Sequence, residues 1–354
     1  MFYHVFGIFS IKITIKKVHF LFLHFYHFDM DIIVNPEGYM YNDHESFIVY
    51  HHKVFLRSFG MNYFLILVAA ILFTVQTLCF KEFNKRYMKN LASYFLFNFL
   101  YFSVVAIILI VAAGGVHPIH APTVYLGVTF GTIFIIAILS YMKAMESGPL
   151  SYAALFFSFG ILVPTLVGLV FWNEKMGLIQ VGGLLLLLVT LYIMNAPSAG
   201  ENKKVNTKWL IFSIVAFLTN GSLMTIMKEH QVLLPGKEAK EFLFLSFGTA
   251  ALLSILIFSW YQLRNKREAV VSHLTGSFFW MIVLGTGMTT AFGNLLGMIL
   301  ANRIPAVLQF PTTNGAIILL TTIASMIIYK EKVTKKGIFG LSLGILAIIL
   351  LSLK

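Results

Sequence analysis

The feature that most constrains this chain is a series of ten apolar segments in residues 61–354, none with Lys, Arg, Asp or Glu at its centre. A helix needs about 20 mainly apolar residues to cross the hydrocarbon core of a bilayer. Backbone groups in hydrocarbon must pair within their own segment, so we expect ten transmembrane helices in an all-α polytopic membrane protein. The segments are approximately 62–80, 91–113, 123–142, 150–172, 177–195, 208–227, 242–261, 277–300, 305–329 and 336–353.

The composition excludes the soluble classes. Apolar residues make up 58% of the chain and charged residues 11%, whereas a soluble domain has about 25% charged residues. A soluble enzyme, a nucleic-acid-binding domain and a disordered scaffold are therefore ruled out. The net charge of +12 comes from basic residues between the apolar segments, which is typical of anchors at a bilayer surface.

Residues 1–60 differ from the rest of the chain. They hold seven of the eleven histidines and all of the aspartates, and their longest apolar stretch, Val18–Phe28, is too short to span. We interpret them as an N-terminal extension. It is either an over-extended reading frame with Met61 as the true start, or a real peripheral extension, a disordered segment or a poorly formed extra helix. The histidines have no regular ligand spacing, so no metal site is predicted there.

The remaining sequence contains a repeat. Asn173-Glu174-Lys175 follows the fourth segment and Lys330-Glu331-Lys332 follows the ninth, while Lys81-Glu82 ends the first segment and Lys228-Glu229 ends the sixth. This predicts two five-helix halves, 61–197 and 208–354. An odd number of spans per half orients the halves oppositely, which is the inverted-repeat plan of many secondary transporters.

Local motifs in both halves resemble the EamA domain, the repeat unit of the drug/metabolite transporter superfamily. In the first half the similarity rests on Leu150–Leu155, Pro164, Trp172–Lys175 and Gly182-Gly183; the second half repeats it with Tyr329–Lys332 and Gly340, but has Thr321 where Pro164 would recur. The resemblance implies a ten-helix secondary transporter for small metabolites that works by alternating access.

A substrate site in these segments must be built from uncharged polar groups, which are costly in lipid unless they face the interior or water. We expect a central cavity between the halves, lined by the third, fourth, eighth and ninth helices with contributions from the first and sixth. Pro311 would free a backbone carbonyl one turn earlier in the helix. The alternative is that these side chains make helix–helix hydrogen bonds. The candidate cavity residues are Gln76, Asn220, Thr290, Asn294, Gln309, Thr312 and Asn314.

Small residues and glutamates are assigned structural roles. Gly127/Gly131, Gly293/Gly297 and Gly340/Gly344 form small-xxx-small pairs, and Gly160, Pro164 and Gly168 share one helix face, so all are expected to allow close helix packing. Glu174 and Glu331 directly precede the fifth and tenth segments, where the dipole of each following helix would stabilise a carboxylate.

Other functions leave weaker traces. The chain lacks a P-loop, so no intrinsic ATPase is expected, and no metal or cofactor is predicted. An enzyme acting on a lipid-type substrate would have to use His117, His120 or His230. We expect a transporter and not an enzyme. The alternatives are that membrane enzyme and a membrane scaffold that does not transport. The partners expected are a small-molecule substrate and the lipid bilayer, with no nucleic acid; coupling to an ion or proton and the oligomeric state stay open.

The orientation in the membrane is not decided by sequence. Connections after the odd-numbered segments carry 15 Lys and Arg, against 6 after the even-numbered segments and at the C-terminus. The positive-inside rule therefore places both termini outside, whereas the family resemblance implies cytoplasmic termini. The expected location is the plasma (inner) membrane of a bacterium.

Overall fold

The computed structural model describes residues 44–115, 118–147, 150–194, 207–264, 276–330 and 335–353. The chain divides into two units, Met1–Phe59 and Gly60–Lys354. The predicted N-terminal extension therefore lies outside the described residues, except that the backbone is helical from His44 onward. His117 and Glu331 also lie outside them.

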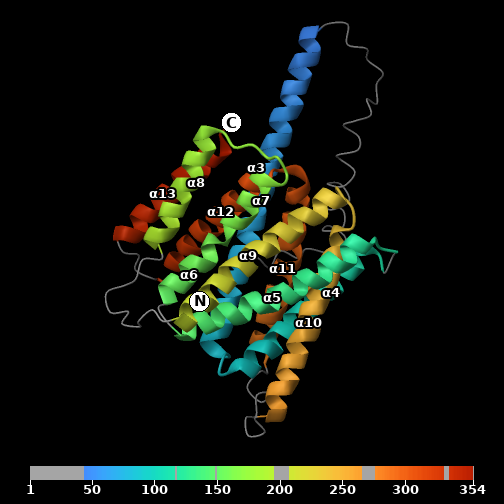
Figure 1. The fold of residues 1–354 in the computed structure, drawn as a ribbon, viewed down its shortest axis with the longest axis vertical. Coiled ribbons are helices and arrows are strands. Elements are labelled where there is room, and N and C mark those ends of the chain that lie inside the picture. Colours follow the sequence, from blue (N-terminus) through green and yellow to red (C-terminus); the bar gives the residue numbers. More distant parts are fainter. Residues whose placement is uncertain are drawn as a thin grey trace. The chain divides into compact units, whose positions relative to one another are not determined.

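Every regular element in the described ranges is a helix (Figure 1). The chain order is α3 (His44–Arg86), α4 (Leu91–Ala113), α5 (Ala121–Ser147), α6 (Leu150–Ser158), the 3₁₀ turn η1 (Phe159–Ile161), α7 (Leu162–Val170), α8 (Leu178–Met194), α9 (Thr207–Leu233), α10 (Ala239–Arg264), α11 (Ser277–Arg303), α12 (Ala306–Ile328) and α13 (Lys335–Ser352). The all-α class predicted from the sequence is confirmed.

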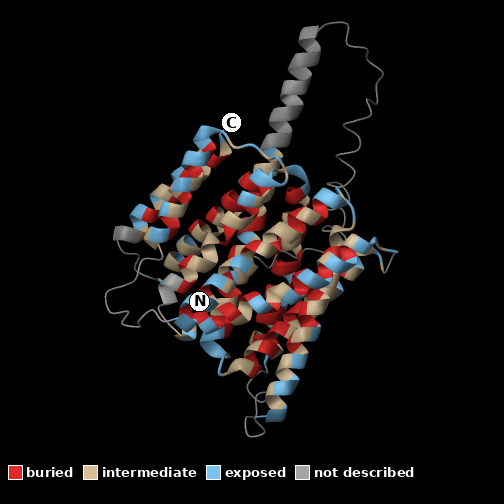
Figure 2. Ribbon diagram, viewed as in Figure 1, coloured by how far each residue is buried: buried red, intermediate tan, exposed pale blue. Residues whose placement is uncertain are grey.

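Eight helical stretches in the described part of the chain are long and apolar enough to cross a membrane, and α8 and Gly337–Ser352 are shorter apolar helices. Large apolar side chains are exposed along the outer faces, for example Leu252 and Leu256 on α10 and Leu185 on α8 (Figure 2). Contiguous apolar surface of this kind is unfavourable in water and ordinary against lipid. The protein is an integral membrane protein.

Close helix contacts depend on glycine, as the small-residue pattern predicted. Gly127 and Gly131 of α5 lie against the backbone of α10. A Cβ at Gly183 of α8 would lie 2.8 Å from the backbone nitrogen of Leu351 in α13, and one at Gly340 of α13 would lie 2.8 Å from Cγ of Met194 in α8. The helix pair α8 and α13 is therefore joined through glycines at both ends of the contact.

The fourth apolar segment is not one continuous α-helix. It is interrupted by η1 between α6 and α7, one turn before Pro164, which has no N–H to donate to the carbonyl of Gly160. Asn220 Nδ2 on α9 donates to the nearby carbonyl of Phe157, at 2.9 Å. Pro311, which the sequence expects to free a backbone carbonyl one turn earlier, lies inside the unbroken helix α12.

Candidate functional site

The turn after α7 brings Glu174 back against α12. Asn173 has a left-handed backbone, with φ 51°, and the Glu174 N–H donates to the carbonyl of Gly168 at 3.0 Å. The Glu174 carboxylate then accepts the first N–H groups of α12, from Ala306 at 2.9 Å and from Val307 at 3.0 Å. The expectation that Glu174 serves the fifth helix is wrong: it caps the ninth, because the left-handed turn directs its side chain away from α8.

The N-terminus of α8 is capped by a residue of α8 itself. Gln180 Oε1 accepts the N–H of Gly177 at 2.9 Å. Gln180 therefore contacts the N-terminus of α8, where the sequence predicted Glu174. This is the reach-back half of a capping box.

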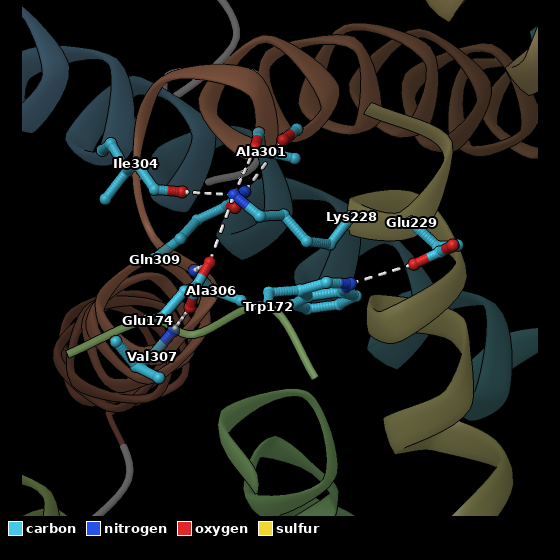
Figure 3. A network of polar contacts seen from close by, with 10 residues as sticks. Trp172, Glu174, Lys228, Glu229, Ala301, Ile304, Ala306, Val307 and Gln309 are labelled. Atoms are coloured by element: carbon cyan, nitrogen blue, oxygen red, sulfur yellow. Dashed lines mark hydrogen bonds and ion pairs between the residues drawn. The ribbon is translucent and has the colours of Figure 1, made fainter. Parts of the chain in front are cut away.

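Lys228, near the end of α9, holds the other side of the same turn. Its ammonium donates to the carbonyls of Ala301 at 2.7 Å and Ile304 at 2.9 Å, at the C-terminus of α11, and lies 3.5 Å from Glu174 Oε1. Figure 3 shows both side chains converging on the turn between α11 and α12. We call this ion pair, Glu174 with Lys228, the turn clamp.

The turn clamp is buried and its polar atoms are paired. The side chains of Glu174 and Lys228 are 9% and 10% exposed. Burying a charge is costly unless it is paired and hydrogen-bonded, and here each charge also complements the helix end that it contacts, an anion at an N-terminus and a cation at a C-terminus. The clamp thus ties the loop after α7 and the end of α9 to one turn.

Two further residues shape the turn clamp. Gly168 makes room for it, because a Cβ there would lie 2.5 Å from Glu174 Oε2. Trp172 Nε1 donates to Glu229 Oε2 on α9 at 2.9 Å (Figure 3). The segments Trp172-Asn173-Glu174 and Lys228-Glu229, which belong to the repeated motifs, therefore contact each other.

The repeat counterparts of these two segments, at Lys81-Glu82 and at Tyr329-Lys330, also contact each other. The ammonium of Lys81, near the end of α3, lies 4.1 Å from the ring centroid of Tyr329, and it donates to Ser325 Oγ at 3.4 Å. Tyr329 is the repeat counterpart of Trp172, and Lys81 that of Lys228. The two lysines differ in their partners: Lys81 contacts Ser325 and Tyr329, whereas Lys228 donates to the carbonyls of Ala301 and Ile304 and pairs with Glu174.

The predicted cavity residues lie along connected helix faces. Gln76 Nε2 on α3 donates to Thr290 Oγ1 on α11 at 2.6 Å, and Asn294 Nδ2 donates to the Thr290 carbonyl at 2.9 Å. One turn further along α11, the carbonyl of Gly297 accepts from Gln309 Nε2 on α12 at 2.8 Å. Gln76 therefore links α3 to α11, and Gln309 links α12 to α11, whereas Asn294 bonds within its own helix.

The other three residues extend this arrangement. The Nδ2 atom of Asn314 on α12 lies 3.9 Å from the sulfur of Met224 on α9. Asn220 precedes Met224 by one turn on the same face of α9. Thr312 is buried within α12. We call the seven residues Gln76, Asn220, Thr290, Asn294, Gln309, Thr312 and Asn314 the polar belt.

One fully buried atom of the polar belt has no hydrogen-bond partner among the described residues. Gln309 is 2% exposed, and its Oε1 accepts no hydrogen bond from any described residue. An unpaired buried acceptor costs about 1–3 kcal/mol, so this oxygen is the place in the belt where an external donor would be most favourable. Among the described residues no three His, Cys, Asp or Glu side chains are grouped to hold a metal ion.

The sequence alone does not predict the turn clamp. The apolar pattern fades before Lys228 and so predicts this residue in a connection, and it predicts that Glu174 serves the fifth helix. The signal that could have joined them was present: both motifs recur in the other half, and repeated charged motifs at helix ends are candidates for equivalent contacts.

Comparison with known proteins gives the fold alone. No family model and no curated protein matches the chain. A solved structure described only as "Crystal structure of protein" is similar, with a TM-score of 0.65 and 16% identity over 82% of this chain and 96% of that one. The helical arrangement is thus one that an experimentally determined protein also adopts.

Proposed function

We propose that the chain is a secondary transporter that moves a small metabolite by alternating access. In this proposal ten helices cross the plasma (inner) membrane of a bacterium as two inverted five-helix repeats of the EamA type. The protein would need no ATP, because transport would be driven by the gradient of its substrate or of a coupled ion or proton.

The observation that carries the proposal is the reciprocity of contacts between the halves. Lys228 faces the residues after α7, and Lys81 faces Tyr329 after α12. The α8–α13 pair is reciprocal too, with Gly183 against α13 and Gly340 against α8. The two lysine contacts differ in kind, but the α8–α13 contact is made by glycines in both directions, as two halves related by a pseudo-two-fold axis require. Transporters place substrate sites at such an interface.

The polar belt supports a substrate of neutral polar or zwitterionic character. It offers amide and hydroxyl groups from α3, α9, α11 and α12 and no side-chain charge. Substrate donors would meet the free Oε1 of Gln309. Sites built for hydrogen bonding discriminate strongly against analogues that lack the matching group, so an uncharged belt is compatible with high specificity.

The turn clamp would serve as the closed contact at one end of the transport path. Alternating access requires that contacts between the halves exchange between the two membrane faces. The clamp joins the first half to the α11–α12 turn of the second, next to Gln309 on the first turns of α12. Its opening would move the end of α12 that carries the polar belt.

The test is flux in liposomes. The purified full-length protein is reconstituted with a metabolite extract inside, and mass spectrometry follows what leaves. A transporter releases particular compounds chemically unchanged and does so less when Gln309 is replaced by Ala. Formation of a new compound would favour the membrane enzyme, and identical release from protein-free liposomes would favour the scaffold.

A further inference from the structure

A second buried polar chain lies where α5 begins and α9 ends. His120 contacts the Glu238 carboxylate through Nδ1 and through its backbone N–H, the latter at 3.1 Å from Oε2. Thr123 Oγ1 donates to Glu238 Oε2 and lies 3.0 Å from His230 Nε2. The imidazole of His120 is 63% exposed, whereas His230 is 0% exposed. The chain thus runs from solvent to the interior.

The chain continues past His230 to the turn between α9 and α10. His230 Nδ1 lies 3.0 Å from Gln231 Nε2, and Gln231 Oε1 accepts the N–H of Gly236 at 3.1 Å. Gly236 has a left-handed backbone, with φ 68°. The Gln231 amide therefore connects the imidazole to the backbone of the turn.

The directions of these hydrogen bonds follow from chemistry. Burial alone would raise the pKa of Glu238, but the hydrogen bonds from Thr123 and His120 outweigh it and lower the pKa. Glu238 is therefore a carboxylate and can only accept, so the Thr123 hydroxyl donates to it. Thr123 then accepts from His230 Nε2–H, which leaves His230 Nδ1 as the acceptor for the Gln231 amide. His230 is neutral in this arrangement.

A second proton on His230 has no acceptor. Nδ1–H would face the NH₂ group of Gln231, donor against donor. The conflict is relieved if the Gln231 amide turns over and presents Oε1 to the imidazole. That oxygen is the one that holds the Gly236 N–H, so the turn loses its hydrogen bond.

Among the groups around His230, the Gln231 amide is the contact that a second proton on the imidazole would change. Glu238 is the charged group that acts on the imidazole, from the α9–α10 connection. Thr123 faces it from α5, and the Phe242 ring of α10 stacks at 4.6 Å between centroids. The neighbouring charges on α9, Lys228 and Glu229, are engaged with Glu174 and Trp172.

We propose that His230 is a proton-binding site, and that its loading from the aqueous phase turns the Gln231 amide and releases the turn at Gly236. The ligand is a proton, and the readout is the mobility of residues 234–238. The inference does not depend on transport or on the identity of a substrate.

Backbone hydrogen exchange of the full-length protein in lipid nanodiscs tests it. Peptides covering residues 231–238 are followed at pH 8 and at pH 4, with correction for the intrinsic exchange rate. We expect corrected exchange at least about tenfold faster at pH 4. An unchanged corrected rate in the wild type would overturn the proposal.

Two variants assign the proton. His230→Asn keeps an acceptor oxygen facing Gln231 but does not titrate, so exchange should stay slow at both pH values. His120→Gln removes the exposed imidazole and should leave the pH response intact. A response that survives His230→Asn, or that vanishes in His120→Gln alone, would contradict the assignment.

A third variant keeps the test valid if His230→Asn does not fold. Gln231→Leu removes the connection between the imidazole and the turn while leaving His230 in place. Exchange should then be fast at both pH values. A Gln231→Leu protein that is slow at pH 8 and speeds up at pH 4 like the wild type would also overturn the proposal.

Discussion

Asn173 and Lys330 have the same unusual backbone: φ is 51° at Asn173 and 53° at Lys330. They occupy corresponding positions in the repeated motif, directly after Trp172 and Tyr329. A side chain in this left-handed region is unfavourable, so the shared conformation reflects a shared requirement to redirect the chain after α7 and after α12.

Replacing these residues with glycine should reveal the strain. Glycine adopts positive φ without penalty, and asparagine tolerates it better than lysine. We expect Lys330→Gly to raise the free energy of unfolding by about 0.5–1 kcal/mol and Asn173→Gly by less. Thermal unfolding in detergent measures both, with Lys175→Gly at an exposed position as control; equal loss of stability in Lys330→Gly and Lys175→Gly would contradict the expectation.

The turn clamp should be strongly coupled. Lys228→Met leaves Glu174 buried with its charge unpaired and should cost about 3–5 kcal/mol. The double variant Glu174→Gln/Lys228→Met removes both charges. Its loss in the free energy of unfolding should be smaller than the summed losses of Glu174→Gln and Lys228→Met, by at least about 1 kcal/mol.

The control for the turn clamp is Lys175→Met, which removes an exposed charge next to Glu174 and should change stability by less than about 0.5 kcal/mol. Additive single effects in the double variant would mean that Glu174 and Lys228 stabilise the α11–α12 turn independently.

Adjacent glycines on α8 offer a matched pair for the contact with α13. A Cβ at Gly183 would lie 2.8 Å from Leu351 N and 3.1 Å from the Ala347 carbonyl, whereas a Cβ at Gly182 meets nothing within 4 Å. Gly183→Ala should therefore destabilise by about 1–3 kcal/mol, and Gly182→Ala should be neutral or gain up to about 1 kcal/mol of helix propensity. Similar melting temperatures for the two variants would refute the α8–α13 packing.

The helices themselves could be predicted from the sequence, because apolar length and the absence of central charges suffice to identify spanning segments. Their ends could not. The helix α9 continues to Leu233 rather than stopping near 227, and α3 continues to Arg86. Helical hydrogen bonds do not stop where the apolar pattern fades, so Lys228 and Lys81 belong to helices rather than to connections.

The polar side chains of the candidate site were identifiable by composition, since uncharged polar groups in apolar segments need partners. Which partners they take depends on tertiary packing. Nothing local to Glu174 indicates that its carboxylate caps α12, because the contact depends on a left-handed residue at 173 and on space left by Gly168.

Acid should weaken the contact between α5 and the α9–α10 connection. Burial raises the pKa of Glu238, but hydrogen bonds from Thr123 and His120 lower it below its ordinary value of 4.5. A carboxyl with a lowered pKa contributes stability that is fully present above its unfolded-state pKa and is lost as the pH falls through the folded-state value. The difference in unfolding temperature between wild type and Glu238→Gln should therefore be constant from pH 7 to about 5 and shrink below about 4.5. A constant difference down to pH 3 would show that the carboxylate is not stabilised by these bonds.

The polar belt is tested by separating transport from folding. Gln309→Ala removes a hydrogen bond to the Gly297 carbonyl and the free acceptor Oε1, and Asn314→Ala removes a hydrogen bond to the Phe310 carbonyl of its own helix. Hydrogen bonds between membrane helices average about 0.6 kcal/mol, so each variant should lose little stability. If these groups contact substrate, flux per folded protein should fall by about tenfold or more, because one lost hydrogen bond to a bound ligand costs about 1.5 kcal/mol.

The control for the polar belt is Thr322→Ala on the same helix. The Thr322 hydroxyl bonds only the Ile318 carbonyl of its own helix in the described contacts, so flux should stay near the wild-type value. If instead flux in Gln309→Ala falls only as far as the amount of folded protein falls, the belt serves helix packing, and the substrate must bind elsewhere.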